Sequence, residues 1–237
     1  MKDMEDPIDD GFAFGVETDS LADSMGLQLP NRSLCLICGE VGSGKSLVSQ
    51  RLVYGLLANG SKVVVVTTEL TTRGWIEQMH SIGYYCTEYI SKGRLIVISR
   101  FGTVAEPIEG VGIEHVLESE SLGEADFIII DAASSLIDDE ITSDEIFATL
   151  QQLRKFCSDG RSLMLTLDPS GTSDRFMRDI RSSAEVVLDM SANLIGGSLK
   201  RGLQVTRFLR AAGPVQTNIG WRVEPSMGFI VDITAVS

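Results

Sequence analysis

Short apolar runs alternate with longer amphipathic segments along most of the chain. The runs occupy residues 33–38, 62–67, 94–98, 127–131 and 162–167, and they are rich in Val, Ile and Leu. Each predicts a strand that is buried on both faces, because the run is continuous rather than alternating. Such strands require helices over both faces of the sheet. The sequence therefore predicts a doubly wound α/β fold with a mostly parallel sheet.

The amphipathic segments predict helices over residues 45–59, 71–82 and 143–157. In the last of these, apolar residues recur at intervals of four, three and four, which places them on one face of a helix. Thr142 and Glu145 have the spacing of a capping box, in which each side chain bonds the other residue's backbone N–H. The apolar stripe consists of Ile146, Leu150, Leu153 and Cys157, and we interpret it as core.

Beyond residue 185 the pattern changes to strands separated by turns that contain Gly or Pro. The segments 185–190, 203–209 and 220–233 predict antiparallel strands that extend the sheet. The first 24 residues hold eight acids and one Lys, and we expect them to be ordered only where Phe12 or Phe14 docks. The predicted organisation is an acidic N-terminal arm over 1–24 and a single domain over 25–237.

The charge of the chain argues against nucleic acid as a partner. Asp and Glu number 33 against 20 Lys and Arg, which gives a net charge of −13. A broad phosphate-backbone footprint needs the opposite balance. Residues 102–145 hold 13 acids and no Lys or Arg. This stretch is either a solvated face or a surface that meets a basic partner, and the sequence leaves both open.

We expect a cytoplasmic protein without direct membrane insertion. No apolar run approaches the roughly 20 residues of a spanning helix, and the N-terminus carries acids where a signal peptide carries bases. Cys35 and Cys38 form a C-x-x-C pair, but they lie in a predicted strand, where positions three apart point to opposite faces. We therefore predict that they pack in the core and bind no metal.

Residues 39–46 read GEVGSGKS, a full match to the phosphate-binding pattern G-x-x-x-x-G-K-[ST]. The match lies between a predicted buried strand and a predicted helix, as the mechanism requires. Its backbone N–H groups and the helix N-terminus would surround the phosphates of ATP, Lys45 would reach the β- and γ-phosphates, and the Ser46 hydroxyl would bind Mg²⁺. The predicted nucleotide-binding residues are Gly39, Glu40, Val41, Gly42, Ser43, Gly44, Lys45 and Ser46.

Asp131 follows four apolar residues at the carboxyl end of a predicted strand. Open α/β sheets bind ligands at this edge, so we predict that Asp131 joins the nucleotide site and holds Mg²⁺ directly or through water. The next residue is Ala132, and the adjacent Glu that many ATPases use is missing. An ordinary strand-end turn is the alternative for Asp131.

Two further acids follow predicted strands. Glu69 is a candidate catalytic base that would polarise the attacking water, or else it caps the helix that begins near Thr71. The sequence does not separate these two roles. Asp168 is a weaker candidate for sensing the γ-phosphate, and before Pro169 it is equally compatible with turn formation.

Together these motifs resemble the RecA/KaiC superfamily of P-loop ATPases. The KaiC-like branch is favoured by VTTEL at 66–70, by RGLQVTRFLRAAG at 201–213 and by IGWRVEPSMGFIV at 219–231. Within that branch, the size, the acidic N-terminus, GEVGSGKS and FIIIDAASS are most similar to the ATP-binding proteins of the archaellum, the archaeal flagellum. The superfamily resemblance covers residues 20–237, and it implies a single RecA/KaiC-like domain.

The resemblance implies a ring-forming cytoplasmic subunit, peripheral to the membrane-embedded motor. Its implied partners are copies of itself, the motor ATPase FlaI and a scaffold protein at the membrane base. In KaiC-like rings a Lys-x-Arg pair reaches the neighbour's nucleotide. Here Arg207 stands near the Lys position, Leu209 stands where the Arg would fall, and Arg210 comes one residue late. The paired Glu residues of such proteins are reduced to Glu69 followed by Leu70.

Three functions follow from these observations. The first is a regulatory ATP-binding subunit of the archaellum motor, in which Mg-ATP acts as a conformational switch with slow or absent hydrolysis. The second is a working ATPase with Glu69 as base and Arg207 or Arg210 acting on a neighbouring subunit. The third, a RecA-like DNA recombination ATPase, rests on fold analogy alone. It conflicts with 6% aromatic residues and with the negative charge.

Overall fold

A computed structural model describes residues 11–101 and 112–232 of the chain. Over these residues the chain builds a nine-stranded sheet in the order β11-β10-β9-β8-β3-β7-β6-β4-β5. The neighbours from β8 to β5 are all parallel. This arrangement confirms the predicted fold class. The parallel strands are β3 (Leu34–Cys38), β4 (Val63–Thr67), β5 (Leu95–Ser99), β6 (Phe127–Asp131), β7 (Ser162–Leu167) and β8 (Val186–Ile195).

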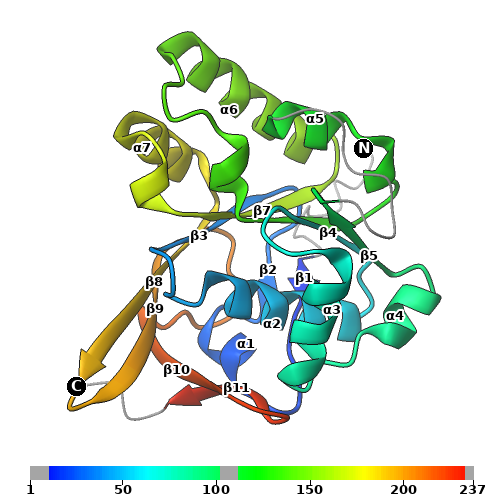
Figure 1. Ribbon diagram of the computed structural model, residues 1–237, viewed down its shortest axis with the longest axis vertical. Coiled ribbons are helices and arrows are strands. Elements are labelled where there is room, and N and C mark those ends of the chain that lie inside the picture. Colours follow the sequence, from blue (N-terminus) through cyan, green and yellow to red (C-terminus); the bar gives the residue numbers. More distant parts are fainter. Residues whose placement is uncertain (1–10, 102–111, 233–237) are drawn as a thin grey trace, which may run out of the picture.

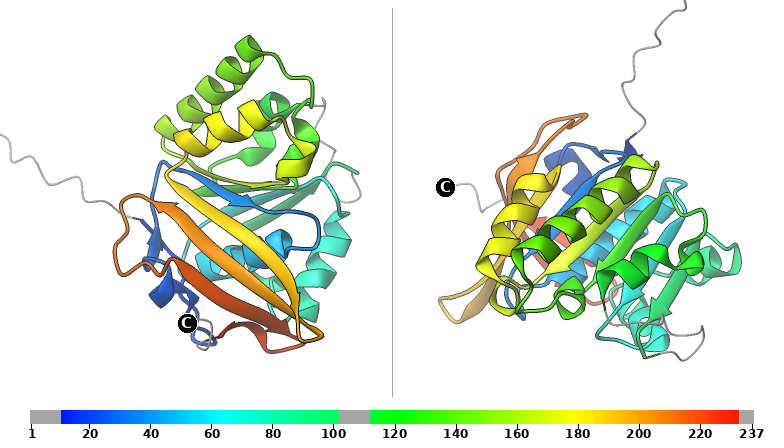
Figure 2. Two further views of the ribbon diagram at one scale, coloured as in Figure 1. Left: turned by 90° about the vertical axis from the view of Figure 1, so that its left-hand side faces the viewer. Right: turned by 90° about the horizontal axis from the view of Figure 1, so that it is seen from above.

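Helices cover both faces of this sheet, as the continuous apolar strands require (Figure 1). Every residue of β3, β4, β6 and β7 is buried. Figure 2 shows the sheet between its two helical layers. One layer contains α2 (Lys45–Ala58) and α3 (Thr72–Ser81), with the short helices α1 (Leu21–Ser24) and α4 (Thr87–Ser91); the other contains α5 (Ile113–Glu118), α6 (Ser143–Ser158) and α7 (Asp174–Ser183).

Helix α6 begins with the predicted capping box, since the Thr142 side chain accepts from the Glu145 backbone and Glu145 accepts from the Thr142 backbone. Helix α7 was not predicted from the sequence. Most of its residues are polar, and its apolar residues Phe176, Met177 and Ile180 form a single narrow buried stripe. Three short 3₁₀ turns, η1 (Glu120–Leu122), η2 (Ala133–Leu136) and η3 (Pro169–Gly171), complete the connections.

The sheet ends in antiparallel strands, as predicted: β9 (Ser198–Phe208), β10 (Asn218–Glu224) and β11 (Gly228–Asp232). The segment 185–190, which was predicted to be antiparallel as well, lies in β8 and is parallel to β3. Strand β8 joins the two parts, because it pairs parallel with β3 on one side and antiparallel with β9 on the other. The β8–β9 hairpin extends beyond its neighbours (Figure 2). Near its tip Leu194 pairs with Leu199, and both side chains are exposed.

Residues 11–24 pack against the rest of the protein. A two-stranded sheet forms from β1 (Phe12–Ala13) and β2 (Gln28–Leu29). Phe14 is fully buried, and the ring of Phe12 meets Phe127 edge-on. The first ten residues of the predicted arm lie outside the described part of the chain, and the boundary at residue 24 stays a prediction.

Cys35 and Cys38 are both free and buried on opposite sides of the sheet, as their spacing predicts. Burial raises the pKa of Cys35 to about 12 and that of Cys38 to about 11, so both thiols are protonated at neutral pH. Across residues 11–101 and 112–232, no group of three His, Cys, Asp or Glu side chains has a metal-binding arrangement.

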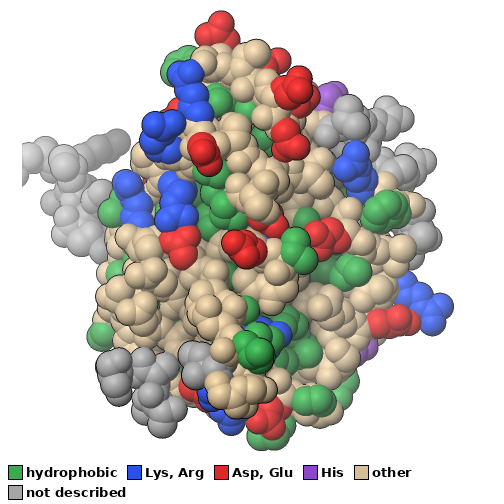
Figure 3. Space-filling view, turned by 60° about the vertical axis from the view of Figure 1, so that its left-hand side comes forward, with side chains coloured by type: hydrophobic (Ala, Val, Ile, Leu, Met, Phe, Trp, Pro, Cys, Tyr) green, Lys and Arg blue, Asp and Glu red, His purple; other side chains and the backbone are tan. Residues whose placement is uncertain are grey.

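Acidic and basic side chains are interspersed on the face drawn in Figure 3. Part of the acidic stretch, residues 102–111, lies outside the described residues, so its role stays open. In the portion of the chain that the structure describes, no helix has both the length and the apolar character needed to span a bilayer.

Candidate functional site

The phosphate-loop motif connects β3 to α2 at the carboxyl edge of the sheet. Residues 39–44 form the loop, and α2 begins at Lys45. Gly42 and Gly44 adopt φ angles of +82° and +97°, in the left-handed region that glycine tolerates without strain. These two residues let the backbone curve back over the N-terminus of α2, which carries the positive end of the helix dipole. The loop predicted from the sequence thus lies between a buried strand and the N-terminus of a helix.

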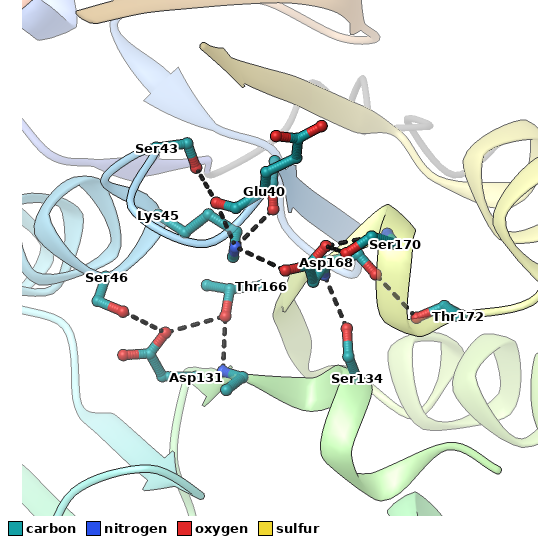
Figure 4. A network of polar contacts seen from close by, with 12 residues as sticks. Glu40, Ser43, Lys45, Ser46, Asp131, Ser134, Thr166, Asp168, Ser170 and Thr172 are labelled. Carbon is teal, nitrogen blue, oxygen red and sulfur yellow. Dashed lines mark hydrogen bonds and ion pairs between the residues drawn. The ribbon is translucent and has the colours of Figure 1, made fainter. Parts of the chain in front are cut away.

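The ammonium group of Lys45 faces the inside of this loop (Figure 4). Its Nζ donates to the main-chain oxygens of Gly39 and Glu40, the latter at 3.0 Å. The same Nζ lies 3.9 Å from Asp168 Oδ2. Ser43 Oγ also donates to the oxygen of Glu40, at 2.7 Å. Lys45 is thus held at the centre of the loop by carbonyl oxygens and one carboxylate.

Asp131 and Ser46 meet at the same edge of the sheet. Asp131 closes β6, and the Ser46 hydroxyl at the start of α2 donates to its Oδ1 at 3.2 Å. Strand β7 lies between β3 and β6, and its Thr166 donates to the same oxygen at 2.9 Å. Ser46 and Thr166 thus donate from two separate elements to one oxygen of Asp131 (Figure 4). Sequence reasoning identified Ser46 and Asp131 but missed Thr166, the polar residue next to the end of an apolar strand.

Burial raises the pKa of Asp131 above its ordinary value, because only 4% of the residue is exposed. Hydrogen bonds from Thr166 and Ser46 oppose this rise, whereas the nearby charge of Glu69 adds to it. A hydroxyl and a carboxylate side by side are the hard oxygen ligands that Mg²⁺ prefers. A divalent cation would also supply the positive charge that this buried carboxylate lacks. The residues present therefore fit a magnesium site.

The backbone after Asp131 is held in an unusual conformation. Ala132 has a φ of +64°, a left-handed value that costs a residue with a Cβ about 1 kcal/mol or more. Its N–H donates to Thr166 Oγ1 at 2.6 Å. The hydroxyl of Thr68 donates to the main-chain oxygens of Asp131 and Ala132, at 3.2 and 2.9 Å. These contacts fix the direction in which Asp131 points.

Glu69 lines the cavity beside the loop, and its side chain is exposed. The sequence also allowed Glu69 to cap the helix that begins near Thr71. In the structure Thr71 caps this helix instead. Its hydroxyl accepts the N–H of Gly74 at 3.1 Å and so caps α3. Glu69 makes no hydrogen bond with the described residues. Its carboxylate is thus open to the cavity.

Asp168 caps the turn that follows β7, and its carboxylate also faces Lys45. Its Oδ1 accepts the N–H and the hydroxyl of Ser170, at 2.9 and 2.7 Å. Partial burial alone would raise the pKa of Asp168, but the bonds from Ser170 and the charge of Lys45 outweigh it and keep that pKa below the ordinary value. Asp168 is therefore an anion, as a turn cap and as a neighbour of the Lys45 ammonium.

A cavity of about 420 Å³ adjoins the loop and brings these groups together. Gly44, Lys45, Ser46, Glu69, Thr166 and Asp168 all line it. Two further lining residues, Gln78 on α3 and Arg201 on β9, were not found by sequence reasoning. No motif marks Gln78. Arg201 begins the segment 201–213 that carries the family resemblance, but it was assigned no role at the site. A second cavity of about 580 Å³ adjoins the loop near Glu40 and Asp189.

Neither of the two arginines that were candidates for action on a neighbouring subunit lines the loop cavity. Arg207 lies on β9, and its buried Nε has no hydrogen-bond partner among the described residues. Arg210 donates to the side-chain and main-chain oxygens of Asn31 at 3.1 and 2.7 Å. Their action in a ring stays a prediction.

The sequence is similar to archaeal proteins along most of its length. The FlaH protein of Methanocaldococcus jannaschii, described as an archaeal flagellar ATP-binding protein, is 31% identical over 220 residues, which are 92% of this chain and 94% of that protein. The protein of the same description from Methanococcus voltae is 28% identical over 223 residues, covering 94% and 97%.

Solved structures have the same fold. The crystal structure of the flagellar accessory protein FlaH from M. jannaschii superposes with a TM-score of 0.84 at 30% identity, covering 95% of this chain and all of that one. A KaiC-like protein from Pyrococcus horikoshii OT3 gives a TM-score of 0.75 at 18% identity and shares the fold over 94% of this chain and 99% of its own. The sequence profile of the KaiC ATPase family matches residues 19–214. A phosphate loop, an acidic strand end and this profile lead to one conclusion: the chain belongs to the KaiC family of P-loop ATPases.

Proposed function

We propose that this chain is an ATP-binding subunit of the archaellum motor, in which bound Mg-ATP stabilises one conformation or assembly and is hydrolysed slowly or not at all. The observation that carries the proposal is the convergence of Lys45, Ser46 and Asp131 at one edge of the sheet, with Ser46 Oγ 3.2 Å from Asp131 Oδ1. The similarity to archaeal flagellar ATP-binding proteins supports the cellular setting.

In this proposal the phosphate loop binds the polyphosphate of ATP. The N–H groups of residues 42–46 and the N-terminus of α2 attract anions, and their contribution does not depend on pH. Lys45 would exchange its bonds to the carbonyls of Gly39 and Glu40 for phosphate oxygens. That exchange favours the nucleotide because a charged acceptor binds an ammonium more strongly than a neutral carbonyl does.

Ser46 and Asp131 would hold the magnesium ion. When bound, Mg²⁺ neutralises the charge of the β- and γ-phosphate oxygens and so strengthens nucleotide binding. Thr166 would keep the Asp131 carboxylate oriented for this role, since it donates to Oδ1 at 2.9 Å. Outer contacts of this kind are commonly needed for full metal affinity.

Slow hydrolysis is proposed because the site offers few groups that activate water. The residue after Asp131 is Ala132, whose methyl group has no acid–base chemistry. Among the residues that line the cavity, the carboxylates are those of Glu69 and Asp168. Asp168 already accepts two bonds from Ser170. A switch needs only different affinities of ATP for two states, typically by about 1–3 kcal/mol.

A working ATPase is the second candidate, and one observation favours it. Glu69 faces the cavity and makes no hydrogen bond with the described residues, which is the arrangement that a general base for water requires. In this reading Arg207 or Arg210 would complete the site of a neighbouring subunit in a ring.

The proposed setting includes the partners that the archaellum implies. We propose a ring of identical subunits that contacts the motor ATPase FlaI and a scaffold protein, peripheral to the membrane. The names of the relatives support the archaellum association. Ring formation would be tested by the sedimentation of the full chain with and without Mg-ATP.

Calorimetry of Mg-ATP binding tests the site. We expect the wild-type chain to bind, and Lys45→Ala to bind at least about ten-fold more weakly, the factor that corresponds to a loss of about 1.4 kcal/mol. Lys155→Ala is a matched control, because Lys155 lies on the far helix α6 outside the loop cavity. Equal affinity of the wild type and Lys45→Ala would show that the site is assigned to the wrong residues.

Phosphate release at saturating Mg-ATP separates the two candidates. The switch predicts turnover well below 1 s⁻¹, which is the low end of the range for typical enzymes. Turnover at or above that rate, abolished by Glu69→Gln, would establish the ATPase and reject the switch.

A further inference from the structure

A cavity of about 520 Å³ lies between α5, α6 and the turn η2, and the proposed nucleotide site does not use it. We call it the α5–α6 cavity. Among the described residues it shares only Ser135 with the cavity beside the phosphate loop. Helices α5 and α6 lie side by side in one layer, on the face of the sheet opposite α2 (Figure 1). The α5–α6 cavity is therefore a second concave site, separate from the phosphate loop.

The floor of the α5–α6 cavity is apolar. Ile113 of α5 is 2% exposed, and Leu136 and Ile137 at the end of η2 are each 8% exposed. Ala148 lines the cavity from α6, and its small side chain leaves the space open on that side. An apolar side chain that entered this cavity would lose most of its contact with water, which is the main source of affinity at concave sites.

The rim of the cavity carries three carboxylates and one cation, which are Glu114, Asp138, Glu145 and Arg100. Glu114 lies 3.3 Å from the ring of His115. In the part of the chain that the structure describes, no Lys or Arg forms an ion pair with any of the three carboxylates. Arg100 donates instead to the main chain of η2, at 3.4 Å. The rim therefore has an excess of negative charge.

These carboxylates keep oxygens that a cation can reach. Glu145 uses Oε2 to accept the N–H and the hydroxyl of Thr142, at 2.8 and 2.6 Å, and these bonds lower the pKa of Glu145. Asp138 uses Oδ1 to accept the N–H of Glu140 at 2.9 Å. The negative charge also extends beyond the rim, because residues 112–145 contain no Lys or Arg.

From this arrangement we propose that the α5–α6 cavity is a docking site for a segment of a partner protein in which an apolar side chain is flanked by Lys or Arg. Protein interfaces combine an apolar centre with a polar rim in this way. Complementary charge on the partner selects it and speeds its association. A second copy of this chain is disfavoured, because its net charge is also −13.

The proposal goes beyond the proposed function and does not require a nucleotide in the phosphate loop. It assigns to the acidic stretch one of the two roles that the sequence left open, a surface that meets a basic partner. The residues that carry it are the apolar floor of Ile113, Leu136 and Ile137 and the carboxylates of Glu114 and Asp138.

Selection of peptides from a random library displayed on phage, with the full chain as the target, tests the proposal. We expect the enriched peptides to combine an apolar residue with neighbouring Lys or Arg. Fluorescence anisotropy of one such labelled peptide then measures its affinity. Ala148→Trp fills the cavity from α6, and we expect it to weaken binding about ten-fold or more, as the loss of a central contact does.

Glu114→Gln combined with Asp138→Asn removes two rim charges and keeps the size of both side chains. We expect the peptide affinity to fall about five-fold, the effect of two exposed charge pairs, and the difference to shrink at high salt. Glu120→Gln combined with Asp139→Asn is the matched control, since it removes the same charge from residues that are exposed but do not line the cavity. Thermal melting verifies that each variant is folded.

The proposal would be overturned if the library yielded no peptide, or if the enriched peptides lacked Lys and Arg. It would also fail if folded Ala148→Trp and the rim variant bound as tightly as the wild type. Residues 102–111 are the alternative occupant, because the chain leaves the described residues at Phe101 and returns at Gly112, which lines the cavity. Peptide binding gained only after residues 103–110 are replaced by a Gly-Ser linker would reject a partner in favour of this chain itself. No outcome alters the assignment of the phosphate loop, because none of the substituted residues lines the loop cavity.

Discussion

Asp131 is buried at the centre of the site, with hydroxyl groups rather than a cation in direct contact. Its Oδ1 accepts from Ser46 and Thr166, and the Lys45 ammonium is engaged elsewhere, with Asp168 and the loop carbonyls. Burial therefore dominates and raises the pKa of this carboxyl. Binding sites commonly contain a group that lowers the stability of the ligand-free protein, because the ligand supplies the missing charge.

The stability of the nucleotide-free protein should depend on this pKa. The folded state holds the Asp131 proton more tightly than the unfolded chain, because the pKa is raised from its ordinary value of 3.8. The contribution of Asp131 to stability is therefore fully present below that value and is lost as the pH rises through the folded-state pKa.

Asp131→Asn removes the buried charge but keeps an oxygen that can accept from Thr166 and Ser46. We expect the free energy of unfolding of the nucleotide-free protein to increase by roughly 1 kcal/mol at neutral pH, in the range of stabilising active-site changes. The same change should weaken Mg-ATP binding. Urea unfolding with and without Mg-ATP measures both effects, and a less stable nucleotide-free variant would contradict this account of Asp131.

At the scale of elements, α2 joins the phosphate loop to the N-terminal segment. Arg51 on α2 and Asp19 form an ion pair whose side chains are fully buried, with Nε–Oδ2 at 2.6 Å and Nη2–Oδ1 at 2.7 Å. Arg51 Nη1 also donates to the main-chain oxygen of Phe14 at 2.9 Å. The helix that carries Lys45 and Ser46 is thus attached to residues 14–19.

Arg51→Ala leaves the carboxylate of Asp19 buried without its partner. We expect a loss of about 3–5 kcal/mol in the free energy of unfolding, the range for a broken buried pair. The double variant Arg51→Met with Asp19→Leu should recover most of this loss, because no buried charge is then left unpaired. Chemical denaturation measures the free energy of unfolding of both variants. A loss below about 1 kcal/mol for Arg51→Ala would show that the N-terminal segment contributes little.

Across the whole molecule, the C-terminal strands contact the phosphate loop through one aromatic stack. Trp221 of β10 packs on Gly44, and Phe229 of β11 packs on Trp221. Strands β10 and β11 form one end of the sheet order, and β4 and β5 form the other. A ligand bound at the loop is therefore expected to stabilise β10 and β11 more directly than β5.

Hydrogen exchange should report this connection. Saturating Mg-ATP is expected to slow amide exchange in residues 218–232 by about ten-fold or more, because opening of these strands would also release the loop that holds the ligand. Residues 95–99 of β5 are the internal control, and Lys45→Ala should abolish the effect. Protection confined to residues 39–46 would contradict a coupling through Trp221.

The sequence by itself determined the features that depend on neighbouring residues. Continuous apolar runs predicted the parallel strands β3 to β7, although the parallel pairing of β8 with β3 was not predicted. The glycine and lysine spacing predicted the phosphate loop, and the strand-end position predicted that Asp131 lies near it. Helix α7 was not predicted, because most of its residues are polar. Its three buried residues, Phe176, Met177 and Ile180, are too few to give a clear helical periodicity. These outcomes follow from local periodicity and local turn geometry, which the chain encodes over short distances.

Only the tertiary structure decided which distant residues complete the site. Thr166 meets Asp131 because β7 lies between β3 and β6, an order that no local pattern specifies. Arg201 and Trp221 reach Gly44 because the antiparallel strands extend the sheet beside β3. The pairing of Arg51 with Asp19 likewise depends on how the N-terminal segment crosses α2. Contacts of this kind are fixed by the order and register of the strands, so they arise only once the whole chain is folded.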